Sequence, residues 1–184
     1  MRLSKGPFKI KRRSAVKLSG LLAVVLCSSL GFGQEVQVAP AKGGIALSVS
    51  AEKPYQLMPG ETKLPILSLQ CLHKNKKGAH VLIFMPGGEV GDPQPAGGKG
   101  GEPFVVKVNG TQRASMWVPY QDTSSYVYFA RSDAERMQFI EAVLNAGTIS
   151  FDFKPFLTGV ATTAVFDLSK LREEVNKHPE CSAQ

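Results

Sequence analysis

Residues 104–111 read FVVKVNGT, and this stretch indicates a β-hairpin. Asn109 and Gly110 separate two apolar-rich runs, the second of which extends from Thr111 to Val118. Asn-Gly is a preferred pair for a two-residue hairpin turn, because both central residues must adopt positive φ. The stretch therefore predicts two antiparallel strands joined by a tight turn near the middle of a chain of 184 residues.

Short apolar segments continue on both sides of this hairpin. Their alternation and length predict strands over residues 45–50, 64–73, 80–85, 125–130, 148–153 and 160–166. Residues 132–147 and 169–177 have the periodicity of helices, and the first begins with a capping box at Ser132 and ends at Gly147, its expected left-handed stop. The sequence thus predicts a β-rich α+β fold, a mostly antiparallel β-sandwich-like sheet of about eight strands with two helices packed at its side.

The chain divides into segments of different composition. Residues 1–33 are expected to be a signal peptide, residues 34–44 a flexible lead-in, and residues 45–184 a single β-rich domain. Residues 86–103 contain seven glycines and four prolines, which excludes regular structure there. This Gly/Pro-rich loop is interpreted either as a flexible insertion between strands or as a partner-binding loop.

The first segment has the basic, apolar and small-residue order of an export signal. Its basic part ends at Lys17, an apolar run fades out by Leu30, and Gly33 supplies a small residue before the expected cleavage site. We therefore expect a periplasmic or secreted protein. Arg12-Arg13 fits either a twin-arginine signal or an ordinary basic segment, and lipidation at Cys27 is disfavoured because the residue before it is a leucine.

The charge distribution argues against a nucleic-acid partner. The whole chain has a formal net charge of +7, but residues 1–33 contain seven basic residues and no acidic one. The remaining residues contain 15 basic and 15 acidic side chains, so the mature chain is neutral and lacks the excess positive charge that phosphate binding needs. The chain after residue 33 also contains no apolar segment that approaches the ~20 residues needed to span a membrane.

Cleavage after Gly33 leaves two cysteines, Cys71 and Cys181. Because export implies an oxidising compartment, one disulfide is the economical interpretation. The alternative is a two-cysteine zinc site, for which His178 is the only histidine close in sequence.

The sequence contains neither a Gly-x-Ser-x-Gly nucleophile motif nor a His-Glu-x-x-His metal motif, and we predict no catalytic residue, no metal site and no cofactor. His73 and His80 flank a hairpin loop and are interpreted as exposed loop histidines. Asp152 and Asp167 are expected to lie ~16 Å apart along one hairpin, too far for a glycosidase pair.

Three aromatic residues remain candidates for contact with a ligand or partner. Trp117 is either a sugar-stacking platform or a core anchor. Tyr126 and Tyr128 lie on one face of a predicted strand, where they form either an aromatic surface patch or cross-strand packing.

A late-strand Cys71, a lone Trp117, Phe139-Ile140 in a helix, the stretch AVFDLS at residues 164–169 with Leu171, and a final Cys181 together resemble an exported bacterial family. These features are similar to the VasI-type accessory proteins associated with type VI secretion and to related small periplasmic proteins, over about residues 64–181. The resemblance implies a periplasmic location, a Cys71–Cys181 disulfide and no catalytic residue. The family usually has glycine where Lys170 stands.

The sequence therefore predicts an exported, non-enzymatic envelope protein that acts through protein–protein contact, with a secretion-system accessory role as its most specific form. Its expected partner is another envelope protein. The alternatives are a small-ligand or glycan-binding module that uses Trp117 and the tyrosines, and a periplasmic hydrolase with an unrecognised site.

Overall fold

The computed structural model describes residues 35–41, 43–72, 79–90, 104–120 and 122–181. The elements in these residues are β1 (Gln37–Ala41), β2 (Gly44–Ser50), β3 (Tyr55–Met58), β4 (Glu61–Lys63), β5 (Ile66–Leu72), β6 (Ala79–Met85), β7 (Phe104–Val108), β8 (Thr111–Arg113), β9 (Met116–Tyr120), β10 (Asp122–Phe129), α1 (Asp133–Leu144), β11 (Thr148–Phe153), β12 (Thr162–Asp167), α2 (Leu171–Lys177) and the 3-10 turn η1 (Pro179–Cys181). No described helix is long and apolar enough to cross a membrane.

The Asn-Gly turn forms as predicted and joins β7 to β8. Asn109 has a φ of 48° and Gly110 a φ of 75°, which are the two positive values that the turn requires. The following run is not one strand, however. It is interrupted at Ala114 and Ser115, so that β8 pairs with β7 while β9 pairs with β10 in another sheet.

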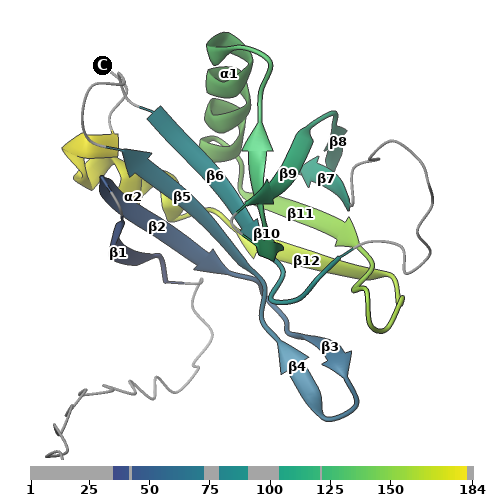
Figure 1. Ribbon diagram of the computed structural model, residues 1–184. Coiled ribbons are helices and arrows are strands. Elements are labelled where there is room, and N and C mark those ends of the chain that lie inside the picture. The colour runs from purple at the N-terminus through teal and green to yellow at the C-terminus, as the bar shows by residue number, and fades with distance from the viewer. Residues whose placement is uncertain (1–34, 42, 73–78, 91–103, 121, 182–184) are drawn as a thin grey trace, which may run out of the picture. The chain divides into compact units, whose positions relative to one another are not determined.

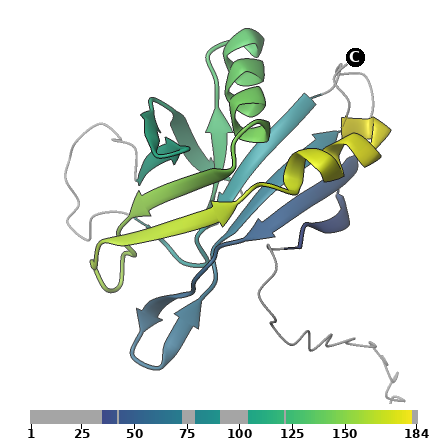
Figure 2. The same ribbon diagram turned by 180° about the vertical axis from the view of Figure 1, so that it is seen from behind.

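The described strands form two larger sheets and a small hairpin. The six-stranded sheet has the order β1-β2-β5-β6-β10-β9, the four-stranded sheet has the order β12-β11-β7-β8, and β3 pairs with β4. All of these pairs are antiparallel. The predicted fold class is therefore confirmed: the described part of the chain is β-rich and contains two α-helices. Figure 1 and Figure 2 show how these helices and the sheets are arranged.

The core lies between the two larger sheets. Phe84 of β6 stacks on Phe151 of β11 with ring centroids 4.1 Å apart, and Phe104 of β7 makes an edge contact with Phe84 at 5.3 Å. These rings come from inward positions that alternate with outward ones along each strand. Burial of such aromatic side chains is the main contribution that holds one sheet on the other.

The predicted capping box is present at the start of α1. The Glu135 amide donates a hydrogen bond to the Ser132 hydroxyl at 3.1 Å, and the Glu135 carboxylate accepts one from the Arg131 amide at 2.8 Å. The expected left-handed stop at Gly147 is wrong, because Gly147 is not among the positive-φ glycines. Instead, the Gly147 amide donates to the Asn109 carboxamide oxygen at 3.0 Å, so the β7–β8 turn fixes the chain after α1.

The segment boundaries need two corrections. Part of the expected flexible lead-in, residues 34–44, is strand β1, which pairs along its length with β2. Within the Gly/Pro-rich loop, residues 86–103, Val90 forms an antiparallel bridge with Pro155 and is buried. Residues 91–103 of that loop and the expected signal peptide, residues 1–33, lie outside the described residues.

Candidate functional site

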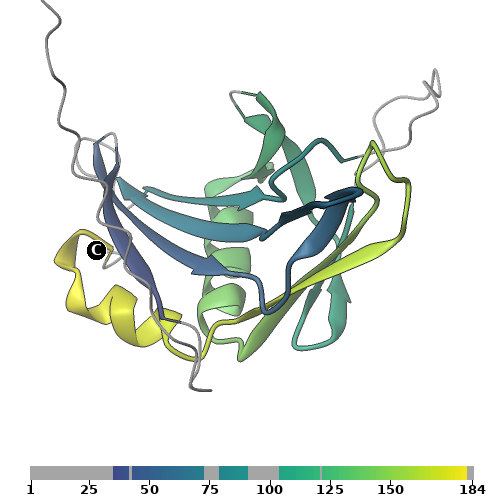
Figure 3. The same cartoon turned by 90° about the horizontal axis from the view of Figure 1, so that it is seen from below.

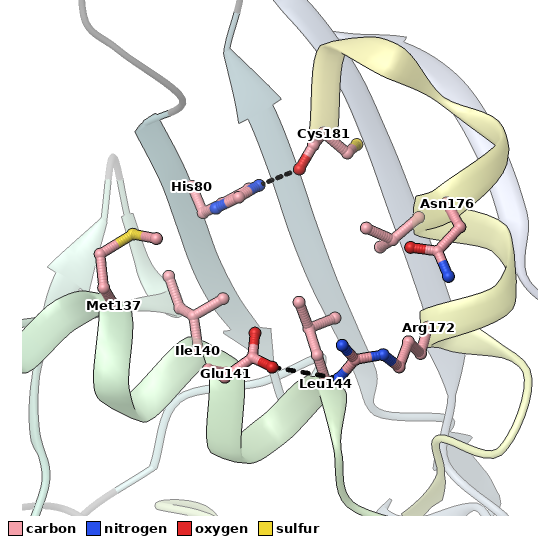
Figure 4. Close-up of a pocket in the computed structure, with 9 residues that line it drawn as sticks. His80, Met137, Ile140, Glu141, Leu144, Arg172, Asn176 and Cys181 are labelled. Carbon is pink, nitrogen blue, oxygen red and sulfur yellow. Dashed lines mark hydrogen bonds and ion pairs between the residues drawn. The ribbon is translucent and has the colours of Figure 1, made fainter. Parts of the chain in front are cut away.

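A cleft with a volume of about 220 Å³ lies between α1 and α2 (Figure 4). The cleft is lined by His80, Met137, Ile140, Glu141, Leu144, Arg172, Val175, Asn176 and Cys181. α1 supplies its apolar wall because the helix places Ile140 and Leu144 four residues apart on one face. α2 is too short to be stable alone and owes its position to the buried side chains of Leu171 and Val175.

His80 lies in the cleft wall and is only 3% exposed. Its Nε2 atom is 2.7 Å from the carbonyl oxygen of Cys181. Because a carbonyl only accepts, Nε2 must carry a proton, and in the tautomer with that single proton Nδ1 is an acceptor. Nδ1 is buried and has no hydrogen-bond partner among the described residues.

The structure corrects the interpretation of the histidines as exposed loop residues. His80 is an inward residue of β6, at the same parity as the core residues Leu82 and Phe84. That parity is the sequence signal that could have placed it in the interior. His73 lies outside the described residues.

A disulfide joins Cys71 to Cys181 beside the cleft. The two Cα atoms are 4.9 Å apart, the residues are 110 positions apart in sequence, and both side chains are buried. The pairing agrees with the economical interpretation of the two cysteines and leaves neither sulfur free for the alternative zinc site. His80 is the cross-strand neighbour of Cys71 as well as the hydrogen-bond donor to Cys181, so it contacts both halves of this connection.

The polar rim of the cleft joins the two helices. Glu141 of α1 and Arg172 of α2 form an ion pair at 3.2 Å (Figure 4), and Arg172 also contacts the Asn145 side chain. The side-chain carboxamide nitrogen of Asn145 in turn donates to the Glu141 carboxylate at 2.7 Å. Such exposed ion pairs contribute only ~0–1 kcal/mol to stability. Here the charges of Glu141 and Arg172 neutralise each other at the mouth of the cleft. The site therefore offers an apolar interior with one buried acceptor.

The three predicted contact residues do not form a surface patch. Trp117, Tyr126 and Tyr128 are 4%, 5% and 7% exposed and belong to the core. Trp117 donates its indole hydrogen to Ser115, and Tyr128 stacks on Phe139 of α1 with ring centroids 4.2 Å apart. They are inward residues of β9 and β10, so of the two interpretations given for each residue the structure supports packing in the interior, and the interpretation as exposed ligand or partner contacts is corrected.

Burial also changes the chemistry of one of these rings. It raises the pKa of the Tyr128 phenol, and the nearby Glu135 carboxylate raises it further. A neutral phenol packed on another ring has a structural role rather than that of an acid or base near neutral pH.

The carboxylates of the late hairpin are also accounted for. Asp152 lies opposite Thr163 and receives a hydrogen bond from the Lys107 ammonium at 2.6 Å. Asp167 is four residues beyond Thr163, so Asp152 and Asp167 lie ~13 Å apart along the hairpin at ~3.3 Å per residue. The two carboxyl groups of a glycosidase are only ~5–9.5 Å apart. The Asp167 carboxylate accepts from the Ser169 amide at 2.9 Å and so shapes the turn before α2.

No protein-family model, curated protein sequence or solved structure matches this chain. The similarity to VasI-type proteins stays an expectation that rests on the residues quoted for it. Within the described part of the chain, no group of three or more metal-ligating side chains lies together.

Proposed function

We propose that this chain is an exported, non-enzymatic envelope protein that acts by contact with another protein, as the resemblance to VasI-type accessory proteins implies. The observation that carries the proposal is the α1–α2 cleft with its buried, unpartnered His80 Nδ1 atom. A buried acceptor without a partner costs ~1–3 kcal/mol, which a matching donor from a partner would recover.

The volume of the cleft indicates what it receives. Sites for drug-sized ligands measure ~300–1,000 Å³, whereas an apolar cavity of ~150 Å³ is large enough for benzene. At about 220 Å³ the cleft fits one aromatic side chain better than a whole small-molecule ligand. We therefore favour an aromatic side chain of a partner protein that carries a donor, with a tyrosine phenol as the simplest case.

The chemistry of the walls supports that choice. Ile140, Leu144 and Val175 offer apolar contact to the ring, and His80 Nδ1 accepts from its hydroxyl. The Glu141–Arg172 pair at the mouth gives the partner's backbone and flanking polar groups a hydrated rim. The buried disulfide serves in this proposal as a structural support for the His80 side of the cleft.

The test uses N-acetyl-tyrosinamide as a probe and N-acetyl-phenylalaninamide as its matched control, each titrated while NMR spectra are recorded. We expect the tyrosine probe to move the His80 imidazole nitrogen resonances with a millimolar-range Kd, and the phenylalanine probe to bind about fivefold more weakly, since one net hydrogen bond contributes ~1 kcal/mol. Filling the cleft with Met137→Trp should abolish both effects, and Gln138→Trp, at an exposed position of α1 outside the cleft, should not. Equal affinities or no movement at His80 would contradict the site.

Export is tested separately. N-terminal sequencing of protein recovered from the producing cell should start near Gln34, because residues 1–33 have the order of an export signal. A mature form that still begins at Met1 would contradict export and would leave the result for the cleft unaffected.

A further inference from the structure

The loop between β11 and β12 contains the two most exposed large apolar side chains among the described residues. Leu157 is 60% exposed and Val160 is 63% exposed, and Phe156 beside them is 39% exposed. We call residues 154–161 the apolar loop. Single apolar side chains on a surface are ordinary, whereas several that gather in one place indicate contact with a partner or a membrane.

Backbone contacts fix the apolar loop in this exposed position. Val90 forms an antiparallel bridge with Pro155, and the Phe156 amide donates a hydrogen bond to the Glu89 carbonyl oxygen at 2.8 Å. The Gly159 amide donates to the Pro155 carbonyl oxygen at 2.8 Å, and the φ of 62° at this turn is one that glycine adopts without strain. The apolar side chains are therefore exposed on a backbone whose own polar groups are partly satisfied.

The apolar loop and the β3–β4 hairpin lie next to each other in the lower part of Figure 1 and of Figure 2. The segment after β6 connects them, because Leu57 of β3 packs on Gly88 and the next residue, Glu89, bonds to Phe156. Figure 3, the view from below, shows the yellow-green loop beside the blue hairpin. The α1–α2 cleft lies at the other end of β6, since His80 is near the start of that strand. A contact through the apolar loop would therefore leave the cleft open.

The charges around the apolar loop favour a negatively charged surface. Residues 153–166 contain one basic residue, Lys154, and no acidic residue. Lys154 is exposed and has no ion-pair partner among the described residues. Glu61 and Lys63 of the neighbouring hairpin pair with each other at 2.9 Å, and Glu89 already takes part in another interaction. The loop thus presents apolar side chains beside one unpaired cation.

We propose that the apolar loop binds the surface of a lipid bilayer. Phe156, Leu157 and Val160 enter the boundary between headgroups and acyl chains, and Lys154 lies at the lipid phosphates. Such binding depends on buried apolar area together with attraction of basic residues to anionic lipids, and the loop offers both.

The size of the apolar loop favours a bilayer over a protein partner. With ~150–200 Å² for each whole side chain, the exposed fractions of these three side chains amount to about 250–320 Å². A specific protein interface needs ~800 Å² on each partner and a matching shape. A bilayer is fluid and needs no matching shape, so a small projecting loop is sufficient for weak binding.

A lipid anchor gives the scale for the expected strength. One myristoyl chain binds membranes with a constant of ~10⁴ M⁻¹, which means half-binding at about 0.1 mM lipid. The apolar loop inserts less apolar surface, so we expect half-binding at about 1 mM lipid on anionic vesicles. One lysine near an anionic surface strengthens binding about fivefold, so neutral vesicles should bind about fivefold more weakly.

The test is cosedimentation with large unilamellar vesicles between about 0.1 and 10 mM lipid, a range that brackets the expected midpoint. One set of vesicles is an equal mixture of phosphatidylcholine and phosphatidylglycerol, and the other is phosphatidylcholine alone. The chain begins at residue 34 and so includes every described strand and helix. Residues 1–33 are left out because their apolar run would itself bind vesicles.

Three variants locate the binding surface. Leu157→Ser combined with Val160→Ser should weaken binding at least about tenfold on both vesicles, because it removes the most exposed apolar area. Phe129→Ser is the matched control: Phe129 is 49% exposed on β10, lies opposite Met116 and should leave binding unchanged. Lys154→Gln should weaken binding about fivefold on the mixed vesicles and leave it unchanged on phosphatidylcholine.

Circular dichroism checks that the variants fold, and Leu157→Ser alone replaces the double change if that variant does not. A chain that stays unbound at the highest lipid concentration overturns the proposal. Binding that survives the serine changes also overturns it, since another surface would then be responsible. Self-association in lipid-free samples that the serine changes abolish would assign the loop to protein contact and would equally overturn it. None of these results depends on the probe titration of the cleft.

Discussion

The disulfide gives the sharpest prediction, because it closes a loop of 110 residues. We consider Cys71→Ala, Cys181→Ala and the double variant. Alanine is chosen over serine because the two residues are 0% and 1% exposed, and a serine hydroxyl buried there would add its own cost. Each single change and the double change remove the same bond, so all three should have nearly the same effect.

The magnitude follows from the sequence separation of 110 residues. In the chain-entropy model, closing a loop of that length removes unfolded-state entropy equivalent to ~4.7 kcal/mol at 25 °C, and measured losses of native disulfides are ~2–5 kcal/mol. A domain of this size has ~5–15 kcal/mol of total stability. We therefore expect each variant to lose ~2–5 kcal/mol, with the double variant within ~0.5 kcal/mol of the singles.

Urea unfolding with linear extrapolation measures this loss. The unreduced protein should have the highest midpoint, and a reductant should lower it to the midpoint of the double variant. The double variant is the control for the reductant, because it has no bond to break and its midpoint should not move.

Thiol labelling tests directly whether the bond between Cys71 and Cys181 is present. If two thiols per mature chain react in the unreduced protein without denaturant, the bond does not exist. A double variant as stable as the unreduced protein would equally refute the entropic argument.

Three further predictions concern single side chains. Asn109→Gly keeps the left-handed turn but removes the acceptor for the amides after α1, so it should lower the free energy of urea unfolding by ~1–2 kcal/mol; an unchanged value would contradict that role. Burial raises the pKa of Asp152, but hydrogen bonds from Lys107 and Thr163 outweigh it and lower the pKa overall. The ~0.2–1 kcal/mol that this carboxylate contributes should therefore be present above about pH 4 and lost as the pH falls through the lowered pKa, and Asp152→Asn should flatten that part of the stability–pH curve. Trp117→Ala should cost ~3–5 kcal/mol in the same urea assay, as loss of a core ring does, and a variant of full stability would restore the surface interpretation.

Local signals explain what could be predicted from the sequence. The hairpin at Asn109-Gly110 depends on the φ values of two residues, and the start of α1 depends on Ser132 and Glu135, which are three positions apart. Strand alternation over residues 148–153 likewise depends only on which side chains face inward. Each of these features is determined by residues that are neighbours in the chain, so the sequence pattern is sufficient to predict it.

The features that the sequence did not predict depend on tertiary packing. The interruption between β8 and β9 depends on where two sheets meet, and strand β1 forms because β2 offers it a partner edge. The cleft brings β6, α1 and α2 together, and no sequence spacing between His80, Ile140 and Val175 indicates this. The roles of the aromatic residues stayed open between core and surface for a different reason: the parity of Tyr126 and Tyr128 was visible, but which face of the strand is buried was not.

The disulfide also bears on the cleft, because it holds the carbonyl group that orients His80. The Cys181 carbonyl oxygen accepts a hydrogen bond from Nε2 of His80 at 2.7 Å, and the bond between Cys71 and Cys181 keeps that carbonyl beside β6. Loss of the disulfide lets the carbonyl move, so the Cys181→Ala chain should bind the tyrosine probe more weakly wherever it remains folded. A Cys181→Ala chain that binds the probe as tightly as the unreduced protein would contradict this coupling between the disulfide and the cleft.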